Sequence, residues 1–120
     1  MRNLLAFDLG ASNGRAILGQ FDGEKITMRE LHRFENNYIE MNGVFYWDLP
    51  YLYNQLKQGL LAFKNANVGT LDCIGIDTWG VDYGLLDKNG QLLSNPRSYR
   101  YAVDEDMACL LYTSTSPRDR

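Results

Sequence analysis

The chain has 120 residues, of which 45% are hydrophobic and 22% are charged, and its formal net charge is −3 at pH 7. These are ordinary values for one small globular domain with a core of its own, so they exclude wholesale disorder. A negative net charge without a lysine and arginine cluster excludes an electrostatic nucleic-acid surface, and no stretch approaches the roughly 18 apolar residues of a membrane span.

The cysteine and histidine content narrows the class further. Cys73 and Cys109 form no CxxC motif, so we expect reduced thiols in a cytoplasmic protein. His32 is the single histidine, which makes a conventional zinc site implausible. The residues before Asp8 hold too few apolar side chains for a secretory signal peptide. We therefore expect a soluble cytoplasmic protein that binds neither nucleic acid nor membrane.

The first part of the chain predicts three strands joined by short turns. Residues 3–9 form an apolar run typical of a buried strand, and a glycine-bearing turn follows at residues 10–14. Residues 16–21 form a second run, and the turn dipeptide Asp22-Gly23 separates it from a third strand at residues 26–34. This order is typical of an antiparallel meander.

The middle of the chain predicts a loop and then a helix. Residues 36–43 are polar and are expected to form a loop, and the aromatic residues that follow, 43–48, are expected to be extended. Asp48 is a typical N-cap residue, and Pro50 suits the first turn of a helix. Helical spacing follows at Leu52, Leu56, Gly59, Leu60 and Phe63. We expect a helix at residues 50–66, with Gly69 just beyond its end.

After this helix, residues 70–93 predict a strand, a turn, a second strand and a hairpin turn at residues 88–90. The first of these strands is expected to return parallel to residues 3–9, because a helical crossover usually connects parallel strands. The predicted fold class is α/β, a mixed sheet covered by a helix on at least one face. Residues 104–112 are typical of the start of a further helix.

The stretch DLGASNGR, residues 8–15, joins a buried strand to the next through a turn that contains two glycines. The tip of such a turn exposes backbone N–H groups that bind phosphate oxygens, and glycine permits close approach and positive φ. Arg15 can add a charge-assisted contact, and Asp8 can orient the waters of a Mg²⁺ ion. The alternative is an ordinary hairpin turn. Neither a GxxxxGK[ST] nor a GxGxxG motif occurs, so this is not a P-loop.

A second apolar strand also ends in a carboxylate, Asp77, with Trp79 and Gly80 close behind it. Ligands in open α/β sheets gather beyond the carboxyl ends of the strands, so parallel strands that end in Asp8 and Asp77 place both carboxylates at one edge. Trp79 offers a flat wall and an N–H donor to a sugar ring. The alternatives are a core tryptophan and, at Gly80, simple turn geometry.

Several stretches together resemble the FGGY carbohydrate kinases and, within them, the rhamnulokinase branch: AFDLGASNGRAIL, LHRFEN, NGVFYWDL, IGIDTWGVDYGLLDKNGQLL and NPRSYR. The resemblance runs from Asn3 to about Arg100. It implies the ribonuclease-H-like, actin-like ATPase fold, with a partial N-terminal domain at residues 1–108. It also implies ATP-dependent phosphorylation of L-rhamnulose at its 1-hydroxyl in rhamnose breakdown, with ATP and Mg²⁺ as cofactors.

The same resemblance implies roles for individual residues. Five consecutive residues match the family's ATP phosphate loop: Ala11, Ser12, Asn13, Gly14 and Arg15. Asp8 matches the aspartate near the metal and the phosphates, where it would act through water. Gly80, with its neighbours Trp79 and Asp77, falls at the sugar site.

The chain departs from the family after Arg100, where Tyr101 stands in place of the usual aspartate. Residues 109–120 match nothing in the family; we interpret them as an atypical tail, for which adaptor or vector read-through is one explanation. The family's catalytic base, adenosine pocket and second domain lie further along, so the fragment is expected to be inactive alone. Two alternatives stay open: a kinase for another sugar or polyol, such as xylulose or fuculose, and a non-enzymatic actin-like nucleotide-binding module.

Overall fold

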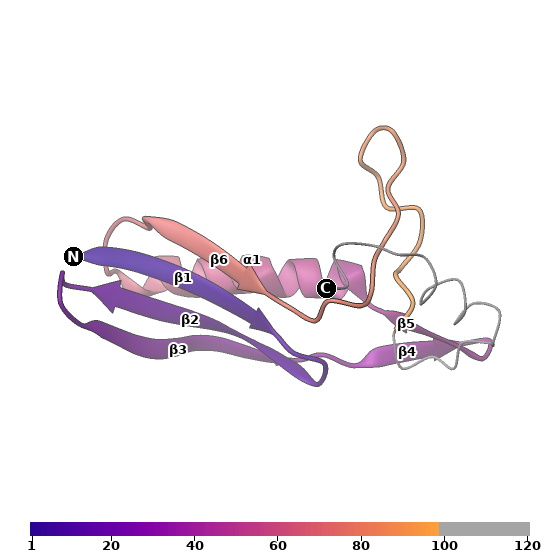
Figure 1. Cartoon of the computed structure of the whole chain (residues 1–120), viewed down its shortest axis with the longest axis horizontal. Coiled ribbons are helices and arrows are strands. Elements are labelled where there is room, and N and C mark those ends of the chain that lie inside the picture. The colour runs from indigo at the N-terminus through magenta and orange to yellow at the C-terminus, as the bar shows by residue number, and fades with distance from the viewer. Residues whose placement is uncertain (99–120) are drawn as a thin grey trace.

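Four strands form the main sheet of the protein, whose computed structural model describes residues 1–98 (Figure 1). The strand order is β3-β2-β1-β6. The bounds are β1 Arg2–Leu9, β2 Asn13–Phe21, β3 Ile26–Glu35 and β6 Cys73–Asp77. The first three strands pair as an antiparallel meander, and β6 returns parallel to β1. The structure therefore confirms the predicted α/β class, the meander and the parallel return.

The helix α1, Leu49–Ala66, precedes β6 in the chain and covers one face of the sheet (Figure 1). Its bounds agree with the prediction, apart from a start one residue earlier. The Asp48 side chain caps the helix by accepting from the Tyr51 N–H at 3.2 Å. At the other end Asn67 adopts a left-handed conformation with a φ of 54°, so the C-cap is Asn67, and Gly69 follows two residues later.

The core lies between α1 and the sheet. Alternate residues of β1 and β2 face the helix and are buried with Phe63: Leu5, Phe7, Ala16 and Leu18. Each such large side chain contributes about 1.5–3 kcal/mol on burial. At Gly59 an added Cβ would lie 2.5 Å from the Phe7 ring and 3.0 Å from the Ala16 Cβ. The helix needs a glycine at this position in order to approach the sheet.

A second hairpin occupies the segment for which we expected a loop followed by an extended stretch. The strands β4, Tyr38–Met41, and β5, Val44–Trp47, pair antiparallel and extend beyond the end of the main sheet (Figure 1). Asn42 and Gly43 form the turn, with φ values of 59° and 81°. An Asn-Gly pair favours this two-residue hairpin turn, so the expected loop at residues 36–43 was wrong for a reason present in the sequence.

The second strand expected after β6 is also absent among the described residues. Residues 78–86 run as an irregular segment, and only the Leu86–Leu92 bridge is strand-like. The predicted turn at residues 88–90 does form, with a hydrogen bond from the Asp87 N–H to the Gln91 carbonyl oxygen at 2.8 Å. An apolar pattern makes a strand only where a neighbouring strand supplies hydrogen bonds, and here no described strand does.

Two further expectations fall at the C-terminal side of the chain. The helix start at residues 104–112 and the atypical tail at residues 109–120 lie outside the described residues. Within residues 1–98, no helix combines the length and the apolar character that crossing a membrane requires.

Asn3 joins the two parallel strands at their amino ends. It is 95% buried, and its backbone N–H donates to an Asp72 carboxylate oxygen at 2.8 Å. Its side-chain N–H group donates to the carbonyl oxygens of Val68 and Thr70 at 3.2 and 2.9 Å. Its side-chain oxygen accepts from Gln20 at 3.1 Å. One buried amide therefore ties the segment before β6 to both β1 and β2.

We expect the substitution Asn3→Ala to lower the free energy of unfolding by about 1–3 kcal/mol, because it leaves two partly buried carbonyl oxygens without their donor and Gln20 without its acceptor. Urea denaturation of the chain, followed by circular dichroism, measures the change. Asn54→Ala, on the exposed side of α1, is the matched control and should stay within about 0.5 kcal/mol of the parent. Equal effects of the two substitutions would contradict this role of Asn3.

Candidate functional site

The carboxyl ends of β1 and β6 bring two carboxylates together. Asp8 and Asp77 are direct partners in the parallel pairing of these strands, as the sequence predicted. Paired residues on neighbouring strands project to the same face, so both side chains lie on the face opposite to α1, which packs on Phe7. The sheet therefore carries an acidic edge beside the tip of the first hairpin.

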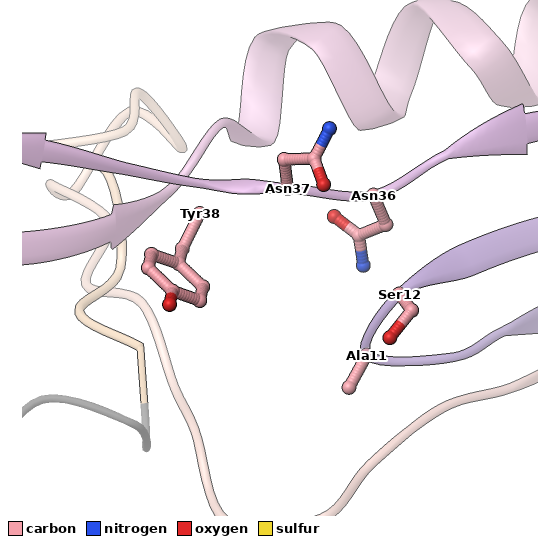
Figure 2. Close-up of a pocket in the computed structure, with 5 residues that line it drawn as sticks. All are labelled: Ala11, Ser12, Asn36, Asn37 and Tyr38. Carbon is pink, nitrogen blue, oxygen red and sulfur yellow. The ribbon is translucent and has the colours of Figure 1, made fainter.

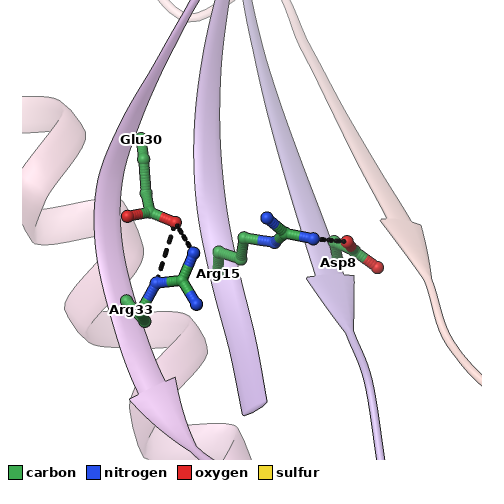
Figure 3. A network of polar contacts seen from close by, with 4 residues as sticks. All are labelled: Asp8, Arg15, Glu30 and Arg33. Atoms are coloured by element: carbon green, nitrogen blue, oxygen red, sulfur yellow. Dashed lines mark hydrogen bonds and ion pairs between the residues drawn. The ribbon is translucent and has the colours of Figure 1, made fainter.

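Arg15 is the partner of Asp8 on the other side. One guanidinium nitrogen lies 3.1 Å from an Asp8 carboxylate oxygen (Figure 3). The two side chains are 40% and 42% exposed, so the pair contributes at most about 1 kcal/mol to stability. Its main effect is on orientation, because it directs the Arg15 head group toward Asp8. A contact between Arg15 and a phosphate stays a prediction.

A second ion pair lies next to the first, on β3. Arg33 donates to a Glu30 carboxylate oxygen at 2.8 and 3.1 Å, and this hydrogen bond lowers the pKa of Glu30 and raises that of Arg33 (Figure 3). Arg33 is also the strand partner of Arg15. Two arginines, one on β3 and one on β2, thus lie beside carboxylates on β3 and β1.

The tip of the first hairpin is a tight turn at Ala11 and Ser12. The Gly10 N–H donates to the Asn13 carbonyl oxygen at 2.8 Å, and Asn13 already belongs to β2. Neither Gly10 nor Gly14 adopts the positive φ that glycine permits. Gly10 is instead required by space, since a Cβ there would lie 2.9 Å from the Asn13 carbonyl oxygen.

Gly14 is required by packing as well. An added Cβ would lie 2.3 Å from the Phe34 ring, which is buried over this position. This residue is therefore buried in β2 beneath an aromatic side chain, while Ala11 and Ser12 form the accessible tip. A substitution at Gly14 would first disturb the contact between β2 and β3.

Asn36 holds the tip in place, and the sequence analysis missed it. Its side-chain N–H group donates to the Gly10 carbonyl oxygen at 2.7 Å, and its backbone N–H donates to the Ser12 carbonyl oxygen at 3.0 Å. The residue is 98% buried. An asparagine directly after a strand suggests a turn, but nothing in its spacing points to a hairpin more than twenty residues away.

A polar cavity of about 220 Å³ opens beside this tip, lined by Ala11, Ser12, Asn36, Asn37 and Tyr38. Figure 2 shows the Tyr38 ring on the opposite side of the cavity from Ala11 and Ser12. The loop tip thus faces an open, polar space rather than the packed core.

Trp79 lies outside the core and packs against Trp47. The ring centroids are 4.5 Å apart, and Trp79 is half-buried while Trp47 is buried. Both indole N–H groups donate to the same Asp82 carboxylate oxygen, at 2.7 Å from Trp79 and 2.5 Å from Trp47. We expected the Trp79 N–H to donate to a sugar, but it already donates to Asp82. Only the face of the indole ring is then left for contact with a sugar.

A second, more apolar cavity of about 320 Å³ adjoins these tryptophans. Its wall includes six further side chains of apolar character: Leu49, Leu52, Tyr83, Leu86, Leu92 and Pro96. Asp77 and Gly80 are exposed and flank in sequence the two lining residues Thr78 and Trp79, and an added Cβ at Gly80 would meet nothing within 4 Å among the described residues. The Tyr38 ring, from the first cavity, touches Trp47 at a centroid distance of 6.3 Å.

The acidic edge fits a magnesium ion better than a metal with a closed protein shell. Within residues 1–98, no three histidine, cysteine, aspartate or glutamate side chains gather as a metal cluster. Mg²⁺ keeps several waters and takes only one or two carboxylates, which Asp8 and Asp77 can supply.

The sequence is similar to three curated rhamnulokinases. It is 48% identical over 100 residues to that of Mannheimia succiniciproducens, 46% identical over 101 residues to that of Bacteroides thetaiotaomicron, and 45% identical over 100 residues to that of Halalkalibacterium halodurans. The chain thus matches a segment of the rhamnulokinase family of sugar kinases. The matches cover 82–83% of this chain but only 20–21% of those proteins, so it spans about one fifth of their length.

Solved sugar-kinase structures share the fold. The xylulose kinase of Rhodospirillum rubrum matches with a TM-score of 0.73 at 15% identity, covering 98% of this chain and 25% of that one. The xylulose kinase of Lactobacillus acidophilus matches with a TM-score of 0.66 at 14% identity, covering 84% and 20%. These neighbours confirm the expected actin-like ATPase fold as a partial domain. No protein-family model matches the chain.

We expect Gly14→Ala to lower the free energy of unfolding by about 1–3 kcal/mol, because the new methyl group overlaps the Phe34 ring. Urea denaturation measures the loss, and Phe34→Leu in the same chain should restore part of it, since the smaller side chain makes room.

Gly75→Ala is the matched control, a glycine in β6 whose added Cβ meets nothing within 4 Å. It should leave stability within about 0.5 kcal/mol of the parent. A loss at Gly14 that Phe34→Leu does not reduce would show that packing is not the reason for this glycine.

Proposed function

We propose that this chain is part of a cytoplasmic kinase that transfers the terminal phosphoryl group of ATP to the 1-hydroxyl of L-rhamnulose, in rhamnose breakdown. The observation that carries the proposal is the register of β1 and β6, which aligns Asp8 with Asp77 beside the tip of the first hairpin. The sequence identity to rhamnulokinases supports the choice of sugar. The exposed free thiol of Cys73 agrees with a reducing compartment.

The hairpin tip is proposed to receive the phosphates of ATP through five residues: Ala11, Ser12, Asn13, Gly14 and Arg15. Three carbonyl oxygens of the turn accept hydrogen bonds from within the protein, those of Gly10, Ser12 and Asn13. Because these negatively polarised oxygens are already bound, they do not point freely at a phosphate. An anion at the tip then meets backbone N–H groups and the Ser12 hydroxyl. Asn36 holds the tip in a fixed conformation, so the entropy cost of ordering the turn when ATP binds is small.

Asp8 and Asp77 are proposed to hold Mg²⁺ through its waters. The ion would neutralise charge on the phosphates, which is the chemistry that phosphoryl transfer needs from it. The ion pair with Arg15 keeps Asp8 pointed along the edge of the sheet. Neither carboxylate is proposed as the general base, which we assign to the part of the kinase beyond this chain.

The sugar is proposed to bind beside Gly80, against the exposed face of Trp79, with Asp77 nearby. A tryptophan face packs well on the C–H groups of a sugar ring, and an exposed glycine leaves room for the ring to approach. The irregular segment after β6 thus forms one wall of the proposed sugar site. The chain contributes to catalysis by positioning the sugar at this wall and the phosphates of ATP at the hairpin tip.

A coupled ADP-release assay tests the proposed reaction. The enzyme for this assay is the Mannheimia succiniciproducens rhamnulokinase in which the aligned segment of 100 residues is replaced by that of the present chain. We expect kcat/KM for L-rhamnulose to exceed that for L-fuculose and D-xylulose by at least about tenfold. A preference for either of the other ketoses would overturn the substrate, and a lack of ADP release with all three would overturn the kinase.

The phosphate loop has a separate test in the same kinase. We expect Ala11→Glu to raise the KM for ATP by about tenfold or more, because a carboxylate at the tip repels the phosphates, with little change in the KM for sugar. Thr27→Glu makes the same change of charge on exposed β3 and serves as the control. A tip variant whose ATP kinetics match those of the control would argue against phosphate binding at this hairpin.

A further inference from the structure

Asp82 is the meeting point of the two tryptophans. One of its carboxylate oxygens accepts from the Trp47 indole N–H at 2.5 Å and from the Trp79 indole N–H at 2.7 Å. Trp79 is three positions away in the sequence, whereas Trp47 is 35 positions away on β5. The carboxylate therefore links the irregular segment after β6 to the second hairpin.

The two tryptophans differ in burial and in the backbone around them. Trp47 is 98% buried, and its backbone N–H donates to the Pro96 carbonyl oxygen at 2.8 Å, so it is a fixed anchor. Trp79 is half-buried in a segment without regular secondary structure. Its indole has a single N–H donor, and the bond to Asp82 uses it. Through Asp82, the half-buried tryptophan is attached to the buried one.

The geometry sets the angle of the exposed ring. The indole planes are inclined at 43° with their centroids 4.5 Å apart, and both rings line the 320 Å³ cavity with Asp82. A hydrogen bond to a charged acceptor is about twice as strong as a neutral one, so this arrangement resists rotation of the Trp79 side chain. Trp79 can therefore present one face to the cavity without being reordered by a ligand.

We propose that Asp82 is a positioning residue for sugar binding: it holds the Trp79 indole as a fixed wall of the cavity, with Trp47 as the anchor. The inference rests on the proposed function, because it concerns the same sugar site. The ligand class is a ketose whose C–H face packs on the ring. Asp82 acts through Trp79, since both indole N–H groups converge on it.

The test replaces the acceptor in the complete kinase. Asp82→Leu removes both hydrogen bonds, and we expect the KM for sugar to rise by about tenfold while the KM for ATP changes by less than about twofold. Asp82→Asn keeps a neutral carbonyl acceptor of the same shape, so its sugar KM should be intermediate. This variant also covers the case in which the leucine variant does not fold.

Tryptophan fluorescence gives a readout that needs no activity. The chain contains two tryptophans, and both belong to this pair, so emission of the 120-residue chain reports on Trp47 and Trp79 alone. Asp82→Leu should shift the emission to longer wavelength and increase acrylamide quenching, because Trp79 is released toward solvent. Asp87→Leu is the matched control, a carboxylate of the same segment that accepts from the backbone N–H groups of Asn89 and Gln91. It should change neither the emission nor the sugar KM.

A double substitution separates positioning from general stability. Trp79→Phe removes the N–H and keeps an aromatic ring, so adding Asp82→Asn to it should raise the sugar KM no further. Full additivity, or equal increases in the sugar and ATP KM, would overturn the role of Asp82. An active parent kinase with an unchanged sugar KM in Asp82→Leu overturns this role alone. A parent that phosphorylates no sugar overturns the proposed function, and this inference with it.

Discussion

The pairing of β1 with β6 depends on Asn3, whose buried amide is bound on three sides. It donates to the segment that leads into β6 and accepts from Gln20 of β2, while its backbone contacts Asp72. These bonds join residues up to 69 positions apart and set where β6 begins against β1. A shift of one residue would turn every side chain of β6 to the other face and separate Asp77 from Asp8. The acidic edge is thus a result of hydrogen bonds at the opposite end of the strands.

Two polar side chains, the buried Asn36 and the half-buried Asp82, each hold one wall of the candidate site in place. Asn36 binds the tip of the first hairpin, and Asp82 binds the tryptophans beside the second cavity. Each lies outside the helix and the main sheet, yet each joins segments that are distant in the sequence. Functional loops are usually positioned by a rigid scaffold. Here hydrogen bonds of one amide, Asn36, and one carboxylate, Asp82, position the loops.

Local patterns were enough to predict the meander, α1 and the parallel return, and a topological rule then predicted the edge formed by Asp8 and Asp77. The extended stretch of β5 was predicted, but β4 and its pairing with β5 were missed although Asn42-Gly43 predicts a hairpin, because the polar character of residues 36–43 was given more weight. The reason for Gly14 and the partners of Asp82 were beyond prediction, since they depend on Phe34 and Trp47 across the fold. Spacing along a chain reports periodicity and turns, but it does not report which distant side chain fills a given space.

The position of β6 in the chain has a consequence for biosynthesis. The three meander strands make neighbouring contacts and can pair as soon as they leave the ribosome, whereas β6 emerges only after the whole of α1. Asp77 ends this late strand, so a nascent polypeptide carries the hairpin tip well before it has both carboxylates. The proposed nucleotide site at this edge would therefore be complete only after the crossover has closed.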